Sequence, residues 1–163
     1  MKQFLEFIMS ILKQLFAQSI PVTPALTVTV PIPSTPAVDT IAPKYLWDTP
    51  INAKHSVRVI CDEEGLSVND KNLICAVIEA ESGFYNTAKN LNKRSDGTVS
   101  STDFGICQIN DRYHIGVGKD FPSVDYVLNN PDQAVRWMIK MYKAGLITMW
   151  CAYTNGSYKR FLI

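Results

Sequence analysis

The sequence predicts a mainly helical α+β domain that follows an N-terminal helix and a proline-rich segment. Three observations support this fold class. Apolar residues recur at helical spacing in several runs that stop at glycines, a polar stretch holds an Asp96-Gly97 turn, and prolines cluster before residue 44. With 163 residues, the chain is of a length that favours one domain. We therefore expect the folded domain to span residues 44–163.

Residues 1–20 are predicted to form an amphipathic helix or a weak signal segment. Its apolar face would carry Phe4, Leu5, Ile8, Met9, Ile11, Leu12, Leu15 and Phe16. Three interpretations remain open. A cleaved secretory signal fits Lys2 and the end at Ala17-Gln18-Ser19, although Glu6 and Lys13 interrupt its apolar core. Otherwise residues 1–18 dock onto a protein assembly or lie on a membrane surface.

Residues 21–43 are predicted to be a Pro/Thr/Val-rich linker. They contain most of the nine prolines of the chain, among Val, Thr, Ala and Ser. Such a composition favours extended, solvated backbone. The prolines also argue against a membrane-spanning helix, because each one removes a backbone hydrogen bond.

In the main domain, we expect helices over about residues 51–64, 69–82, 105–113, 130–144 and 147–155. Gly65, Gly83 and Gly145 follow three of these runs, and glycine readily adopts the left-handed conformation that ends a helix. Residues 85–102 are polar, and Asp96-Gly97 predicts a hairpin turn among them. The domain should therefore combine helices with a small β-hairpin.

Glu81 is the first candidate for chemistry, because helical phase places it on the apolar face of its helix. It follows Val77 by four residues and Ile74 by seven, whereas Glu79 points the other way with Asn72 and Cys75. Desolvation by apolar neighbours and the negative end of the helix dipole should both raise the pKa of Glu81. A carboxyl group that stays protonated near neutral pH can act as a general acid. The alternative is an ordinary surface glutamate in the last helical turn.

Four motifs in order resemble the lytic transglycosylase domain, of the soluble-lytic-transglycosylase type, in the lysozyme-like superfamily. They are Glu81-Ser82-Gly83-Phe84, Gly105-Ile106-Cys107-Gln108-Ile109-Asn110, Asn130-Pro131-Asp132-Gln133 and Ala152-Tyr153-Thr154-Asn155-Gly156. The resemblance covers about residues 44–163. It implies a lysozyme-like fold with the hairpin beside a substrate cleft.

The resemblance also implies roles for single residues. Glu81 would be the catalytic acid and base, and the substrate-binding residues would be Ser82, Gln108, Asn110 and Tyr153. Tyr153 could equally be a core aromatic residue. The chain departs from the family pattern at Cys107, where a bulky apolar residue is usual, and at Thr154, where an asparagine is usual.

Asp103 is a second catalytic candidate, because Ser101–Ile106 also resembles the segment of animal-type lysozymes that holds their second carboxylate. A retaining glycosidase places two carboxyl groups about 5 Å apart, and lysozyme, the relative invoked here, is the standard example. If Asp103 does not face the cleft, Glu81 would act alone. A third possibility is that Asp103 caps the next helix.

The resemblance implies an enzyme that cleaves the β-1,4 bond of peptidoglycan between N-acetylmuramic acid and N-acetylglucosamine. Lytic transglycosylation would leave 1,6-anhydro-muramic ends, and the alternative is a retaining muramidase that uses Glu81 and Asp103. A catalytically silent glycan-binding component of a wall-penetrating machine is the alternative outside enzymes. No metal or other cofactor is implied. Such a protein would act outside the cytoplasm, in the periplasm or cell wall or after secretion, or as part of a virion.

The charge and the cysteine content of the chain argue against several other classes of function. The formal net charge is +1 with acids and bases interspersed, so we expect no nucleic-acid partner. The cysteines, Cys61, Cys75, Cys107 and Cys151, show no metal-ligand spacing. Their even number permits disulfides, and their apolar surroundings fit buried thiols as well. A cysteine nucleophile is disfavoured, because neither His55 nor His114 lies in a motif.

Overall fold

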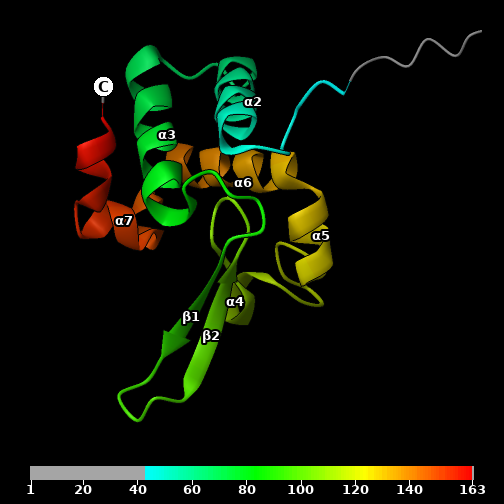
Figure 1. Cartoon of the computed structure of the whole chain (residues 1–163), viewed down its shortest axis with the longest axis vertical. Coiled ribbons are helices and arrows are strands. Elements are labelled where there is room, and N and C mark those ends of the chain that lie inside the picture. The colour runs from blue at the N-terminus through cyan, green and yellow to red at the C-terminus, as the bar shows by residue number, and fades with distance from the viewer. Residues whose placement is uncertain (1–42, 163) are drawn as a thin grey trace, which may run out of the picture. The chain divides into compact units, whose positions relative to one another are not determined.

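The computed structural model describes residues 43–162, which form helices around a core and a small antiparallel sheet that extends from them (Figure 1). The helices are α2 (Pro50–Glu63), α3 (Val68–Ser82), α4 (Asp111–His114), α5 (Val124–Asn129), α6 (Pro131–Lys143) and α7 (Cys151–Thr154). Two 3-10 helices, η1 (Ile147–Met149) and η2 (Ser157–Phe161), complete the helical part. The strands are β1 (Lys89–Lys93), β2 (Val99–Phe104) and β3 (Ile109–Asn110).

This arrangement confirms the mainly helical α+β class with a hairpin. The predictions for residues 1–20 and for residues 21–42 lie outside the described residues. Within the described part of the chain, no helix has the length and apolar character needed to cross a membrane.

The first two helices form an antiparallel pair whose ends follow local signals. The side chain of Thr49 accepts a hydrogen bond from the backbone N–H of Asn52, and Pro50 opens α2. Gly65 follows with φ +71°, as predicted. Lys54 pairs with Glu79 at 2.9 Å near one end of the two helices, and Lys71 pairs with Asp62 near the other.

Helix α3 lies at the centre of the core, and its five residues Ile74–Ile78 are all buried. One part of the helical-phase prediction is therefore wrong. Cys75, expected on the polar side with Glu79, is only 4% exposed. The reason is tertiary packing, because α3 contacts α2, α7 and η2 (Figure 1). A helix covered on several sides does not need a polar stripe at every turn.

The hairpin is built as the Asp96-Gly97 dipeptide predicts. Arg94 N–H donates to the Thr98 carbonyl at 2.8 Å, and Gly97 turns with φ +82°. The Asp96 carboxylate accepts from the backbone N–H of Thr98 at 2.9 Å. β1 pairs with β2 and β2 with β3, all antiparallel. Figure 1 shows this sheet extending away from α2 and α3.

The helix expected over residues 105–113 is wrong. Residues 105–108 form turns, and only α4 is helical in this region. Gly105 and Gln108 have φ values of +74° and +50°, in the left-handed region that interrupts a right-handed helix. A side chain at Gly105 would also be crowded, because a Cβ atom would lie 3.3 Å from Cγ1 of Val127.

The C-terminal region agrees with the prediction in part. Helix α6 begins at Pro131 and is followed by Gly145 with φ +77°. The single helix expected over residues 147–155 is divided into η1 and α7 by Trp150, which has an extended backbone. At this interruption of the helix, the Trp150 indole N–H donates a buried hydrogen bond to the Cys107 carbonyl at 2.8 Å. The short helix α5 was not predicted.

A cluster of charges fixes the segment that enters α2. Glu63 forms ion pairs with Lys44 at 2.6 Å and with Arg136 of α6, and it accepts a hydrogen bond from the Tyr45 hydroxyl at 2.6 Å. The hydrogen bonds from Lys44, Tyr45 and Arg136 lower the pKa of Glu63 to about 2. A second contact joins this segment to α2, because the Ser56 hydroxyl accepts a hydrogen bond from the N–H of Leu46 at 2.9 Å.

All four cysteines are free thiols. Cys61, Cys75 and Cys107 are buried, and Cys151 is exposed. Burial raises the pKa of Cys61 to about 12, which keeps this thiol protonated and unreactive.

Candidate active site

Glu81 occupies the last turn of α3, at the end of the buried run of that helix. Its side chain is half-buried. Desolvation raises the pKa of Glu81, the N–H of Ala152 opposes this rise, and the negative charge of Asp103 adds to it. The direction agrees with the sequence-based expectation, and desolvation is the largest cause.

The Glu81 carboxyl group has a fixed backbone donor. Its Oε1 accepts a hydrogen bond from the N–H of Ala152 at 2.7 Å. Ala152 belongs to α7, which Trp150 anchors through the bond to the Cys107 carbonyl. Trp150 is buried, and its indole N–H has the hydrogen-bond partner that a buried tryptophan usually finds. The position of the Glu81 carboxyl therefore depends on a segment 71 residues away in the sequence.

The residues after Glu81 end the helix sharply. The Ser82 hydroxyl donates to the Ile78 carbonyl at 3.1 Å and accepts from the Phe84 N–H at 3.2 Å. Gly83 is left-handed, and so is Phe84 at φ +64°, which is unusual for a bulky residue. Phe84 is buried beneath Lys54, whose Nζ lies 5.4 Å from the ring centroid. The Glu-Ser-Gly-Phe sequence thus holds Glu81 on a rigid helix end.

Asp103 lies in β2, between its pairing partners Asn90 of β1 and Asn110 of β3. Its Oδ1 accepts a hydrogen bond from Asn110 Nδ2 at 2.6 Å. Its Oδ2 accepts from Asn92 Nδ2 at 2.9 Å. The possibility that Asp103 caps the next helix is wrong, because Asn110 caps α4 by accepting from the N–H of Arg112 at 3.1 Å.

Gln108 is 8% exposed, and both ends of its side-chain amide are satisfied. Nε2 donates to the Gly105 carbonyl at 2.8 Å, and Oε1 accepts from Asn90 Nδ2 at 2.8 Å. Its positive φ of +50° costs energy for a residue that is not glycine. These two hydrogen bonds hold the strained turn between β2 and β3.

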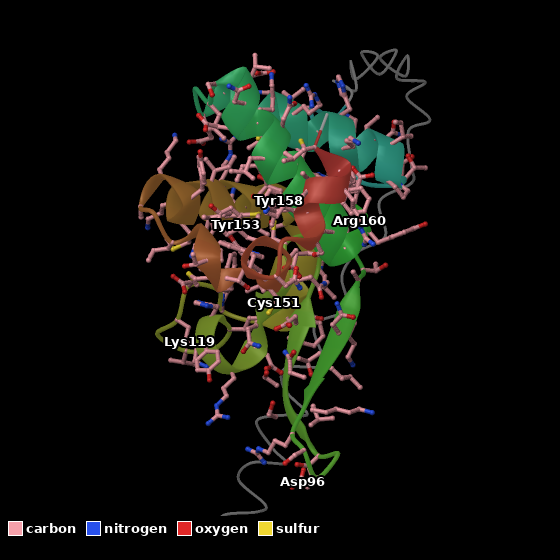
Figure 2. All side chains as sticks on the ribbon, turned by 90° about the vertical axis from the view of Figure 1, so that its left-hand side faces the viewer. Asp96, Lys119, Cys151, Tyr153, Tyr158 and Arg160 are labelled. Atoms are coloured by element: carbon pink, nitrogen blue, oxygen red, sulfur yellow. The ribbon has the colours of Figure 1, made fainter. Side chains whose placement is uncertain are left out.

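Tyr153 follows Ala152 and stacks on Tyr158, with ring centroids 5.2 Å apart and an interplanar angle of 16°. Figure 2 shows the two tyrosines side by side. Among residues 43–162, the Tyr153 hydroxyl has no hydrogen-bond partner. Thr154, which stands where the resemblance leads one to expect an asparagine, donates from its hydroxyl to the Cys151 carbonyl at 3.1 Å. That hydroxyl therefore bonds within its own helix.

The structure separates the two glutamates of α3. Glu81 accepts from the backbone of α7, whereas Glu79 pairs with Lys54 of α2. The negative charge of Asp103 makes the smallest contribution to the raised pKa of Glu81, after desolvation and the opposing Ala152 N–H. The candidate site therefore joins Glu81 to Ala152 of α7, a residue from a distant part of the chain. Within residues 43–162, no group of three or more His, Cys, Asp or Glu side chains could hold a metal ion.

Comparison with known proteins identifies the family of the chain. The family model described as the transglycosylase SLT domain matches residues 62–160. The chain belongs to the transglycosylase SLT family. It is therefore an enzyme, a lytic transglycosylase that acts on the glycan strands of peptidoglycan, and its action takes place outside the cytoplasm. The resemblance drawn from the four motifs is confirmed.

A search of curated proteins finds no match. Among solved structures, the chain is similar to a lysozyme from Litopenaeus vannamei, with 24% sequence identity and a TM-score of 0.44. That match covers 62% of this chain and 83% of the lysozyme.

Sequence reasoning missed two parts of the site in this SLT domain. The first is the backbone N–H of Ala152, which no side-chain pattern reveals. The second is the pair Asn90 and Asn92, which bond to Gln108 and Asp103. Their spacing of two was the available signal, because alternate residues of a strand share one face. Ser101 and Asp103 on β2 show the same spacing.

Proposed function

We propose that this SLT enzyme cleaves the β-1,4 bond between N-acetylmuramic acid and N-acetylglucosamine with Glu81 as its single acid and base, and that the products end in 1,6-anhydro-muramic acid. The observation that carries the proposal is the half-buried Glu81 carboxyl, held by the Ala152 N–H at the rigid end of α3. Family membership supports the substrate class.

In the first step Glu81 acts as a general acid. Its raised pKa keeps more of the carboxyl protonated near neutral pH than an exposed glutamate would be. The proton goes to the glycosidic oxygen, the bond from that oxygen to the anomeric carbon breaks, and positive charge develops on the muramic acid ring. The N-acetylglucosamine side leaves with a new hydroxyl group.

In the second step the Glu81 carboxylate acts as a general base. It takes the proton from the 6-hydroxyl of the same muramic acid residue, and that oxygen bonds to the anomeric carbon. The ring closes without water, and Glu81 regains its proton. Throughout, the Ala152 N–H stays on Oε1, which leaves Oε2 for the transferred proton.

Asp103 fits this mechanism as a charge that stabilises the cation. Both of its oxygens hold amide hydrogens, at 2.6 and 2.9 Å. A covalent nucleophile needs an oxygen that can approach the anomeric carbon. A carboxylate anchored at both oxygens is better suited to electrostatic support of the developing charge.

The alternative is a retaining muramidase in which Asp103 attacks the sugar. One feature favours it, since the negative charge of Asp103 contributes to the raised pKa of Glu81. In that reaction water completes the cleavage, and the new ends are reducing sugars.

The other predicted site residues divide into two groups. The side chains of Ser82, Gln108 and Asn110 are occupied by hydrogen bonds within the protein, so we assign them to shaping the site. Tyr153 keeps its hydroxyl available beside Ala152, and we assign it to sugar contact.

Substitution of each glutamate of α3 tests the proposal. Glu81→Gln should lower wall cleavage on the order of 10² to 10⁴-fold, because the general acid is lost while the shape is kept. Glu79→Gln is the matched control on the same helix, and it should keep most of the activity, because Glu79 only pairs with Lys54. Mass spectrometry of the digested wall should find anhydro ends. Activity surviving in Glu81→Gln would remove Glu81 from the mechanism.

A further inference from the structure

Four side chains on three strands form a closed ring of hydrogen bonds around Asp103. Asn92 Nδ2 donates to Asp103 Oδ2 at 2.9 Å and to Ser101 Oγ at 3.2 Å. Asn110 Nδ2 donates to Asp103 Oδ1 at 2.6 Å and to Ser101 Oγ at 3.0 Å. β1, β2 and β3 each contribute to this ring.

The ring uses both N–H groups of each asparagine and both lone pairs of the serine oxygen. Each side-chain amide has two N–H groups, and in both asparagines one can serve Asp103 and the other Ser101. The serine oxygen has two lone pairs and accepts both bonds. Because the donors approach different oxygens of Asp103 from opposite neighbouring strands, rotation of its carboxylate would break one of them. Asp103 is therefore fixed in direction as well as in position.

The ring is also fastened to the rest of the domain. Oδ1 of Asn110 caps α4 through the N–H of Arg112 at 3.1 Å. Asp111 of α4 accepts from the N–H of Thr102 at 2.9 Å, which ties the helix back to β2. The amide of Asn110 consequently has no freedom to leave Asp103 without loss of the helix cap.

We propose that Asn92 and Asn110 are positioning residues of this enzyme, whose amides hold the Asp103 carboxylate as a fixed charge directed to the reacting sugar and prevent it from acting as a nucleophile. This inference rests on the function proposed above. A fixed charge is more effective than a mobile one, because no reorganisation is needed when positive charge develops.

The test is a double-mutant cycle on the full-length enzyme. Asn92→Ala removes one amide, and Asn110→Ser removes the other while serine can still cap α4. Each should lower kcat about fivefold, the value of one hydrogen bond, and by no more than Asp103→Ala does, with a smaller change in KM. In an Asp103→Ala background, the same two substitutions should lower kcat no further.

The controls separate positioning from folding. Ser100→Ala changes the neighbouring residue of β2, whose hydroxyl donates to the Asn92 carbonyl at 3.0 Å, and kcat should stay within about twofold because the ring is untouched. Thermal melting of every variant shows whether it is folded. Rescue is tested with Asn92→Gln, which restores an amide on a longer side chain and should recover part of kcat.

The double-mutant cycle can overturn the positioning role of the asparagines without overturning the proposed function. If Asn92→Ala lowers kcat by the same factor with and without Asp103, the amide does not act through that carboxylate, and the inference is overturned. An unchanged kcat in both single variants overturns it too. Loss of activity in Glu81→Gln together with anhydro products would still support Glu81 as the acid in either case.

Discussion

The end of α3 and the middle of the sheet each hold one carboxyl group of the proposed site, and the surroundings of the two groups differ. Glu81 is half-buried at a helix end and accepts one backbone hydrogen bond. Asp103 lies on a strand and accepts a side-chain amide at each oxygen. Desolvation raises the pKa of Glu81 and so favours its protonated form. Two carboxyl groups in one site can thus have different tasks because different elements hold them.

The two carboxyl groups also differ in how near in the sequence the residues that hold them lie. Asp103 is held by residues from the same small sheet, all between positions 90 and 110. Glu81 depends on the C-terminal segment, through Ala152 and the Trp150 anchor. Changes near the sheet should therefore alter the charge that supports the cation, whereas changes near the C-terminus should alter the acid.

After removal of the acid by Glu81→Gln, the largest effect is expected from moving it. Glu81→Asp shortens the side chain by one methylene, so the carboxyl withdraws from the Ala152 N–H and from the glycosidic oxygen. Misplacement by about 1 Å can cost on the order of 10²-fold in rate. Steady-state assays on purified cell wall measure this loss. Activity near that of the unchanged enzyme would mean that the position of Glu81 is not critical.

A smaller effect is expected at the sheet. Asp103→Asn should keep a substantial part of the rate and leave anhydro ends, because the substrate supplies the nucleophile. In a muramidase the same change should cost roughly 3 kcal/mol or more of transition-state stabilisation. Rate and product ends are measured together. Reducing ends and a collapsed rate would reverse the assignment in favour of hydrolysis.

Stability should respond to pH through Glu81. Because its pKa is raised above the ordinary 4.5, the folded protein holds the proton more tightly than the unfolded chain. Above about pH 4.5 the unfolded chain releases its proton first, and the free energy of unfolding falls until the folded pKa is passed. In Glu81→Gln the side chain cannot ionise, so the free energy of unfolding does not fall for this reason as the pH rises. The melting temperature of this variant should match that of the unchanged protein at low pH and exceed it at neutral pH, and an equal difference at all pH values would contradict the raised pKa.

The smallest effect is expected from removing residues 1–43. The described residues 43–162 belong to one compact unit, and a chain that begins at Lys44 keeps the contacts of Lys44 and Tyr45 with Glu63. The free energy of unfolding should change by less than about 1 kcal/mol. Thermal melting and wall digestion check this. A large fall in the melting temperature would show that the removed segment stabilises the domain.

The parts of the fold that depend on local signals were predictable. Gly65 and Gly145 follow their helices, and Asp96-Gly97 forms the hairpin turn, as the sequence indicates. The Glu81 position was predictable too, because helical phase and the four motifs agree. The predicted helix over residues 105–113 failed, since the left-handed Gln108 is stabilised by its contact with the distant Asn90.

The remaining errors have the same physical origin. Cys75 is buried because helices from elsewhere in the chain cover α3. Trp150 interrupts the last predicted helix because its indole bonds to Cys107, 43 residues away. Each depends on a tertiary contact that local propensity does not encode.

The Ala152 N–H gives this enzyme a built-in spectroscopic label. Because this amide proton points at the Glu81 carboxyl, its nuclear magnetic resonance frequency should follow the charge on that group as pH changes. The ionisation of the acid can then be followed at one backbone resonance, without a substrate and without modification of the carboxyl. Slow deuterium exchange at the same amide would report how seldom α7 opens, and so how rarely the acid loses its support.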